Sequence, residues 1–240
     1  ITSILFSLGF SKNKIIETFY TTSKYSYNSE SKSWVTDFDL ENFKRPQKLS
    51  YDLIDSKNNK KVLNAGEKLN IVIAKKLQEK GLKSISIPND QIIGKYIGSD
   101  IKEKNGDLLI GAGFDITEEQ LEKIIAQGEN ELSLVNIDPI NKGPYILETL
   151  KIDKNSDKSE ALSDIYKVLR PGEAPSVEIA EEIFNNLYFK KERYDLSEVG
   201  RVKLNSKLNL NTSTKKTTLE TTDIVAIIKF MLDLRDGKGD

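Results

Sequence analysis

A nine-residue pattern recurs in this chain 47 residues after its first occurrence. Residues 62–70 read VLNAGEKLN, and residues 109–117 read LIGAGFDIT. The same offset relates further pairs of similar chemistry, namely Leu77 and Ile124, Gly81 and Gly128, Ile85 and Leu132, and Ile87 and Leu134. Self-similarity at a fixed spacing is typical of a duplicated structural unit. The sequence therefore predicts two copies of one unit.

Each copy has the pattern of a strand, a turn, a helix and a second strand. The helices are expected to begin after the N-caps Asn70 and Thr117, and a glycine follows each of them as a terminator. Residues 82–87 and 131–135 alternate between apolar and polar, as half-buried strands do. Two such copies around a shared core predict a small α+β module.

Four other stretches of this module also predict local structure. Residues 92–98 favour a further strand, and residues 102–107 carry the Asn-Gly signal of a hairpin turn. Residues 25–35 and 48–54 suit short strands, which we expect in a separate satellite sheet.

The rest of the chain has helical character. Residues 1–20 predict a helix pair broken at Gly9, with Ile4, Leu5 and Leu8 on one face and Ile15, Ile16 and Phe19 on another. A helix over 160–169 is expected to stop at Arg170-Pro171-Gly172, because proline cannot continue a helix.

Three more helices are expected towards the end of the chain. Ser176 is a candidate N-cap for residues 177–187, in which Ile179, Ile183 and Leu187 form the expected buried stripe. Ser197 is the corresponding candidate for a helix around Val202. Thr222 is the candidate cap for residues 223–234, whose apolar face comprises Ile224, Ile227, Ile228, Met231 and Leu232.

These patterns predict an α+β protein in two bodies. A helical body formed by residues 1–20 and 139–240 is interrupted by the duplicated α+β module at residues 21–138. Such an insertion is tolerated when the ends of the inserted segment lie close together on the host surface.

Composition excludes several classes of site. The chain has no cysteine and no histidine, so it cannot form disulfides, zinc sites of the usual ligands or a histidine-assisted nucleophile. No apolar run approaches the ~20 residues of a membrane-spanning helix, and no leader pattern opens the chain, so we expect a cytoplasmic protein without membrane contact. The first and last residues suggest a segment cut from a longer protein.

Positive charge is local, because the whole chain carries a formal charge of −1. Residues 190–216 hold eight basic residues against three acidic ones, a local charge of +5. Arginines near Tyr194 would suit phosphate contacts and base stacking on single-stranded nucleic acid. The alternative is an ordinary solvated helix face, with Arg193 paired to Asp195 or Glu198.

A resemblance to a known family is carried by four stretches, residues 143–150, 165–175, 193–205 and 234–240. The chain resembles the lobe region of the bacterial RNA polymerase β subunit over essentially its whole length, with weaker similarity in the duplicated module, which looks like a lineage-specific insertion. Two conservative departures are Ala174, where proline is usual, and Val202, where methionine is common.

The resemblance implies a wall of the DNA cleft rather than a catalytic centre. It implies Arg170, Arg193, Arg201 and Lys203 as contacts to DNA, especially the non-template strand, with Arg170 alternatively acting only as a helix cap. The implied partners are the β′, α and ω subunits and sigma factor. The resemblance implies no cofactor in these residues, since the catalytic Mg²⁺ belongs to another subunit. Regulators acting at the secondary channel are a further hypothesis for the inserted module.

Two other classes of function remain open from the residues alone. One is a free-standing protein-interaction module without a nucleic-acid role. The other is a carboxylate enzyme, for which Asp37 with Asp39 and Asp153 with Asp157 are the candidate pairs. Residues 111–113, GAG, are expected to form a turn rather than a phosphate loop, because the Lys-Ser/Thr that must follow is missing.

Overall fold

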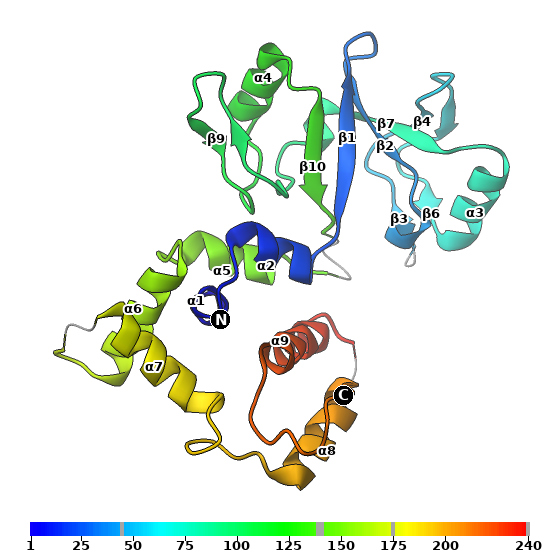
Figure 1. Ribbon diagram of the computed structural model, residues 1–240. Helices are drawn as coiled ribbons and strands as arrows, with labels where there is room; N and C mark the ends of the chain where they lie inside the picture. The colour runs from blue at the N-terminus through cyan, green and yellow to red at the C-terminus, as the bar shows by residue number, and fades with distance from the viewer. Residues whose placement is uncertain (44–45, 138–141, 174–175, 239–240) are drawn as a thin grey trace. The chain divides into compact units, whose positions relative to one another are not determined.

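A computed structural model of the chain describes residues 1–43, 46–137, 142–173 and 176–238 (Figure 1). The predicted domain boundary at Asp138 and Pro139 and the departure at Ala174 lie outside these residues. The chain divides into two compact units, one formed by residues 1–19 and 139–240 and the other by residues 20–138. Both helices and antiparallel strands are present, so the fold is α+β.

The second unit is built on a six-stranded antiparallel sheet in the order β10-β1-β2-β7-β4-β5. Two small two-stranded sheets, β3 with β6 and β8 with β9, accompany it. The strands are β1 (Thr22–Asn28), β2 (Ser33–Asp37), β3 (Gln47–Lys48), β4 (Leu53–Asp55), β5 (Lys61–Leu63), β6 (Lys68–Leu69), β7 (Ser84–Pro88), β8 (Ile101–Lys102), β9 (Leu108–Ile110) and β10 (Glu131–Val135).

The helices of this unit lie beside the small sheets (Figure 1). Helix α3 (Ile71–Glu79) lies near β3 and β6, and α4 (Glu118–Gln127) lies near β9 and β10. Two short 3₁₀ helices, η1 (Leu40–Phe43) and η2 (Asn89–Gln91), complete the unit. One continuous core joins these elements, with Trp34, Leu53, Leu69, Ile92 and Ile97 completely buried.

The two segments with similar sequences make equivalent hydrogen bonds through their backbone N–H groups. Ala65 N–H donates to Asp52 Oδ1 at 2.8 Å, and Ala112 N–H donates to Asp100 Oδ1 at 2.7 Å. The next residues, Gly66 and Gly113, have φ of +88° and +84°, which is why glycine occupies both positions. Each then donates its N–H at 2.8 Å, Gly66 to Leu49 O and Gly113 to Ile97 O.

The correspondence continues through the helices. The side chain of Asn70 accepts the N–H of Ile73 and the side chain of Thr117 accepts that of Gln120, so both predicted N-caps are confirmed. At the other ends, Leu82 N–H reaches Leu77 O and Glu129 N–H reaches Ile124 O. Residues 111–113 form a turn between β9 and α4, as expected.

Two strand predictions in this unit are wrong. Residues 92–98 form turns and two isolated bridges, since Gly94 has a φ of +81° that interrupts an extended strand. The strands expected in a satellite sheet, β1 and β2, instead lie at the centre of the main sheet, between β10 and β7. The hairpin turn predicted over 102–107 is confirmed between β8 and β9.

The first unit is helical. Its elements are α1 (Thr2–Ser7), α2 (Lys12–Phe19), α5 (Tyr145–Ile152), α6 (Lys158–Leu169), α7 (Val177–Tyr188), α8 (Ser197–Leu208) and α9 (Thr221–Arg235). Helices α1 and α6 pack together, as do α6 and α7. The predicted break at Gly9, the stop after Leu169 and the Ser176 cap are all confirmed.

Some expected faces of these helices differ from the structure. On α7 the buried side chains are Ala180 and Phe184, whereas Ile179 is 50% exposed. On α9 the N-cap is Glu220 rather than Thr222, and only Asp223 and Ile228 are buried. None of the helices in the described part of the chain has the length and apolar character that crossing a membrane requires.

Candidate nucleic-acid surface

Arg170 lies at the end of α6, and 57% of its side chain is exposed. Its backbone N–H caps the helix by donating to Tyr166 O at 2.8 Å. Its guanidinium Nη1 lies 3.9 Å from Glu173 Oε2, a loose contact. The backbone therefore performs the capping, which leaves the guanidinium directed at the surface.

Tyr166 supports the turn after α6. Its hydroxyl donates to Glu173 Oε2 at 2.5 Å, and this hydrogen bond to a carboxylate, assisted by burial, raises the pKa of Tyr166. The bond ties α6 to the turn that follows Pro171. Arg170 thus projects from a braced turn, which limits the conformational entropy that a contact would cost.

Arg201 is completely buried, so the prediction that it contacts nucleic acid is wrong for this side chain. Its Nη1 lies 2.8 Å from Asp223 Oδ1, and its Nε donates to Lys216 O at 2.7 Å. A third bond joins Nη2 to Thr218 O. Three internal acceptors hold this guanidinium. It cannot contact a DNA strand unless α8 separates from α9.

Asp223 lies in the first turn of α9 and accepts hydrogen bonds from a second donor besides Arg201. Its Oδ2 accepts the N–H of Glu220 at 2.8 Å, and the Glu220 side chain reciprocates in a capping box. Asp223 therefore fixes the start of α9 and neutralises Arg201 at the same time. Sequence reasoning missed this role because Arg201 and Asp223 are 22 residues apart.

Lys203 and Arg193 are exposed. Two residues along an α-helix correspond to a rotation of ~200°, so Lys203 projects from the face of α8 opposite the buried Arg201. Arg193 lies in the turn between α7 and α8, where its N–H donates to Lys190 O at 3.0 Å. Neither side chain has an ion-pair partner within the part of the chain that the structure describes.

An aromatic pair lies beside Arg193. The rings of Tyr188 and Tyr194 have centroids 5.6 Å apart and meet edge to face at 81°. Tyr188 is 41% exposed. The turn thus combines an arginine with partly exposed aromatic surface, as the sequence predicted for base stacking.

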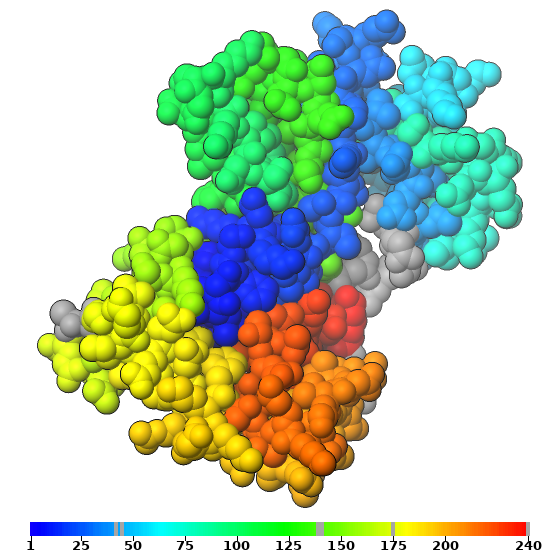
Figure 2. Space-filling view, viewed as in Figure 1, coloured from blue at the N-terminus to red at the C-terminus, as the bar shows by residue number. Residues whose placement is uncertain are grey.

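The positive charge of residues 190–216 is partly neutralised by their surroundings. Lys190 lies 3.8 Å from Glu182, Lys216 lies 2.7 Å from Glu220, and Arg201 is paired with Asp223. When these three carboxylates are counted with the segment, its local charge falls from +5 to +2. The surface is shown by the yellow and orange parts of Figure 2, and any attraction of polyanions there is weak.

The predicted contacts fall into two separate places. Arg170 lies before α7, whereas Arg193 lies after it, and α7 has 12 residues. At 1.5 Å per residue these turns lie about 18 Å apart. Lys203, on α8, belongs with Arg193, because α8 begins directly after the turn that carries Arg193.

One of the two carboxylate pairs proposed for an enzyme, Asp153 with Asp157, has structural roles here. Asp153 Oδ2 accepts the hydroxyls of Thr2 and Ser3, which joins α1 to the end of α5. Asp157 is the N-cap of α6 and accepts the N–H groups of Ser159 and Glu160. The described residues include no group of three or more acidic side chains that could hold a metal ion.

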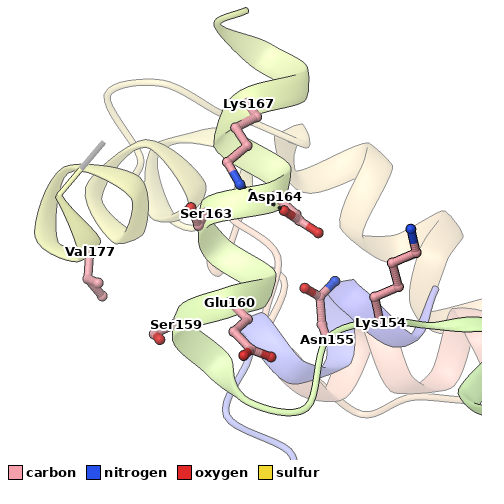
Figure 3. A pocket seen from close by; sticks show the side chains of 8 residues that line it. All are labelled: Lys154, Asn155, Ser159, Glu160, Ser163, Asp164, Lys167 and Val177. Atoms are coloured by element: carbon pink, nitrogen blue, oxygen red, sulfur yellow. Dashed lines mark hydrogen bonds and ion pairs between the residues drawn. The ribbon is translucent and has the colours of Figure 1, made fainter. Parts of the chain in front are cut away.

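A surface hollow of about 410 Å³ lies beside α6 (Figure 3). Three of its charged side chains are already engaged, since Asp164 pairs with Lys167 at 3.3 Å and Glu160 accepts the hydroxyl of Ser156 at 2.9 Å. The lining residue Asn155 is buried, and its side-chain amide donates to Asp153 Oδ1 at 3.0 Å. The side chains that line the hollow are Lys154, Asn155, Ser159, Glu160, Ser163, Asp164, Lys167 and Val177.

Comparison with known proteins assigns the chain to a family. Residues 132–240 match the family model described as RNA polymerase Rpb2, domain 2. The whole chain is 40% identical to the DNA-directed RNA polymerase subunit beta of Rhizobium leguminosarum bv. trifolii and 41% identical to that of Rhizobium etli. The corresponding identity to the subunit of Cereibacter sphaeroides is 38%.

The chain spans about a sixth of these relatives, 17% of the two Rhizobium proteins and 18% of the Cereibacter protein. All of this chain is covered in each comparison. Helices α5 to α9, with the turns that carry Arg170 and Arg193, lie in the part that the domain model matches. The chain is therefore a segment of the β subunit family of bacterial DNA-directed RNA polymerase.

Proposed function

We propose that this chain forms part of the wall of the DNA cleft, the lobe, in a DNA-directed RNA polymerase. It serves DNA-templated RNA synthesis by shape and charge, and contributes no catalytic residue. The observation that carries the proposal is the match of residues 132–240 to Rpb2 domain 2, within a chain that is similar to β subunits throughout its length. The Mg²⁺ chemistry of the parent enzyme belongs to another subunit.

The nucleic-acid contacts are Arg170, Arg193 and Lys203. Their exposure supports the proposal, and so does the placement of both arginines in turns at helix ends, where side chains reach furthest from the body. The buried Arg201 acts as a positioning residue, because it holds α8 against α9 and thereby orients Lys203. The non-template strand is the expected partner, with the arginines on phosphates or unstacked bases.

Site-specific photocross-linking tests this assignment in the assembled polymerase. A benzoylphenylalanine at position 170 or 193 should cross-link to promoter DNA in the open complex, and a matched probe at Asn155, which is buried, should not. Absence of DNA cross-links from both arginine positions would contradict the role of this surface.

The second unit is an insertion in the lobe that contains two copies of one strand–helix–strand unit. Gly66 and Gly113 make equivalent backbone hydrogen bonds, and Asn70 and Thr117 cap their helices in the same way, which supports duplication. The start of the family match at residue 132, near the end of this unit, supports insertion. The host lobe then comprises residues 1–20 and 139–240.

The assembled enzyme supplies the partners. The β′, α and ω subunits and sigma factor are expected to surround the lobe in the cytoplasm. Regulators that act at the secondary channel are the expected binding partners of the inserted module. A polymerase that lacks residues 21–138 should retain basal RNA synthesis. Loss of basal synthesis in that variant would show that the insertion is needed by the catalytic machine.

A further inference from the structure

The two similar segments of the inserted module provide an internal comparison. Residues 60–70 and 107–117 adopt the same turn with the same backbone hydrogen bonds. The fold therefore makes the same demands at corresponding positions. The backbone conformation therefore does not explain a difference between their exposed side chains. Such a difference reflects the binding partners or solvent that each surface contacts.

The exposed side chains of the two turns differ in both charge and polarity. Lys60, Lys61 and Lys68 of the first turn correspond to Asp107, Leu108 and Asp115 of the second. In addition, Asn64 and Glu67 correspond to Gly111 and Phe114. The first turn is thus basic and polar, and the second is acidic and apolar.

The first turn is closed by its own polar contacts. Asn64 Nδ2 donates to Glu67 Oε1 at 2.9 Å, and Lys61 Nζ lies 2.6 Å from Asp52 Oδ2. These exposed groups satisfy one another or water. Nothing in this turn calls for a partner.

The second turn exposes a small apolar surface. A Cβ placed on Gly111 would lie 3.5 Å from Phe114 Cδ2 and 3.7 Å from Leu108 Cδ2, so both side chains flank the bare backbone of Gly111. Phe114 is 40% exposed and Leu108 is 59% exposed. We call Leu108, Gly111 and Phe114 the β9 patch.

Carboxylates surround the β9 patch in the sequence. Between residues 100 and 119 there are six acidic residues and two lysines, a net charge of −4. The corresponding residues 53–72 hold four lysines and two acidic residues, a net charge of +2. An apolar surface with an acidic rim complements a basic segment that presents an apolar side chain.

We propose that the β9 patch is a docking surface for a basic segment of another protein, with an aliphatic or aromatic side chain placed over Gly111 between Leu108 and Phe114. The proposal rests on the proposed function in one respect, namely that the module projects from an assembled polymerase. A carbon atom over Gly111 would be in van der Waals contact with both Phe114 and Leu108, so an apolar anchor placed there contacts all three residues. The rim carboxylates select lysine- or arginine-rich partners.

The test uses assembled polymerase in living cells, with benzoylphenylalanine at Phe114, or at Leu108 if the first variant fails to assemble. The matched control places the probe at Glu67, the corresponding position of the first turn. Cross-linked peptides are sequenced by mass spectrometry. The proposal expects a basic segment of a protein other than β, at a yield at least fivefold above that of the Glu67 control.

A charge-reversed variant, Asp107→Lys with Asp115→Lys, should lower this yield at least fivefold. Lysine occupies both corresponding positions in the first turn, so the backbone accommodates the change. A yield insensitive to charge reversal, no yield above the control, or cross-links to an acidic segment, to DNA or to β itself would overturn the proposal. Basal RNA synthesis of the same enzymes reports separately on the proposed function.

Discussion

Arg201 on α8 and Asp223 on α9 form a buried ion pair, with Nη1 and Oδ1 2.8 Å apart and neither side chain exposed to solvent. The pair joins two helices that otherwise bury few side chains, since Ile228 is the buried apolar residue of α9. Because burial removes both charges from water, each depends on the other. Arg201 also depends on the carbonyls of Lys216 and Thr218, and Asp223 on the N–H of Glu220.

Removing one partner of this pair should be costly. Arg201→Ala leaves Asp223 buried without its counterion and should lower the free energy of unfolding of the helical unit by about 3–5 kcal/mol. Lys203→Ala, on the exposed face of the same helix, should change it by less than about 0.5 kcal/mol. Equal effects of the two substitutions would contradict a stabilising role for the Arg201–Asp223 ion pair.

Two optical signals separate the units in that measurement. Trp34 is the only tryptophan of the chain and is completely buried in the second unit, so its fluorescence reports on that unit. Far-ultraviolet circular dichroism is weighted towards the helices of the first unit. The Arg201→Ala change should move the urea midpoint seen by circular dichroism and leave the fluorescence midpoint in place.

Lys95 should make the stability of the second unit depend on pH. Burial lowers its pKa to about 8, and its Nζ lies 3.2 Å from the hydroxyl of Tyr25. The unfolded chain, in which the amine titrates near its usual pKa of 10.5, then binds more protons than the folded chain between about pH 8 and 10.5. The free energy of unfolding should therefore rise with pH above about 8.

The two tyrosines of the same region act in the opposite direction at higher pH. Burial raises the pKa of Tyr25, and burial with the nearby Tyr25 raises the pKa of Tyr51 to about 12. Above about pH 10 the unfolded chain loses these protons first, so stability should fall. Urea unfolding followed by Trp34 fluorescence should show the rise in the natural protein and not in Lys95→Met, and a persistent rise in that variant would exclude Lys95 as its cause.

Gly98 passes close to both β1 and β10, and its N–H donates to Ser133 O at 2.7 Å. A Cβ at this position would lie 2.8 Å from Thr22 Cγ2 and 3.3 Å from Ser133 O. Gly98→Ala should therefore destabilise the second unit by about 1–3 kcal/mol, as overpacking does. Thr22→Ser removes the clashing methyl group and should restore part of the loss in the double variant, whereas simple additivity of the two changes would argue against the contact.

The local signals of the sequence located most helix ends. Gly9, Ser176 and Arg170 with Pro171 act through the backbone geometry of a few neighbouring residues, and the structure places the predicted breaks, cap and stop there. The face of α7 was shifted, because Ala180 and Phe184 fill the interface with α6 and leave Ile179 exposed. Periodicity alone does not show which neighbour a helix packs against.

Features that depend on distant residues could not be predicted. The central position of β1 and β2 results from pairing with β10 and β7, far along the chain. Arg201 resembled a surface arginine beside Gly200 until the structure placed Asp223 against it. The exposed candidates Arg170, Arg193 and Lys203 need no such partner, and their proposed contacts remain predictions.

The lifetime of the promoter open complex tests the central claim most directly. Arg170→Ala and Lys167→Ala each remove one exposed positive charge at the C-terminal end of α6 in the assembled polymerase. Lys167 lies 3.3 Å from Asp164, whereas Arg170 makes only the looser contact of 3.9 Å with Glu173. A contact from Arg170 to the DNA predicts a lifetime shortened about tenfold by Arg170→Ala alone, as for a lost charged hydrogen bond. Equal lifetimes for the two variants and the natural enzyme would contradict a DNA-facing role for Arg170.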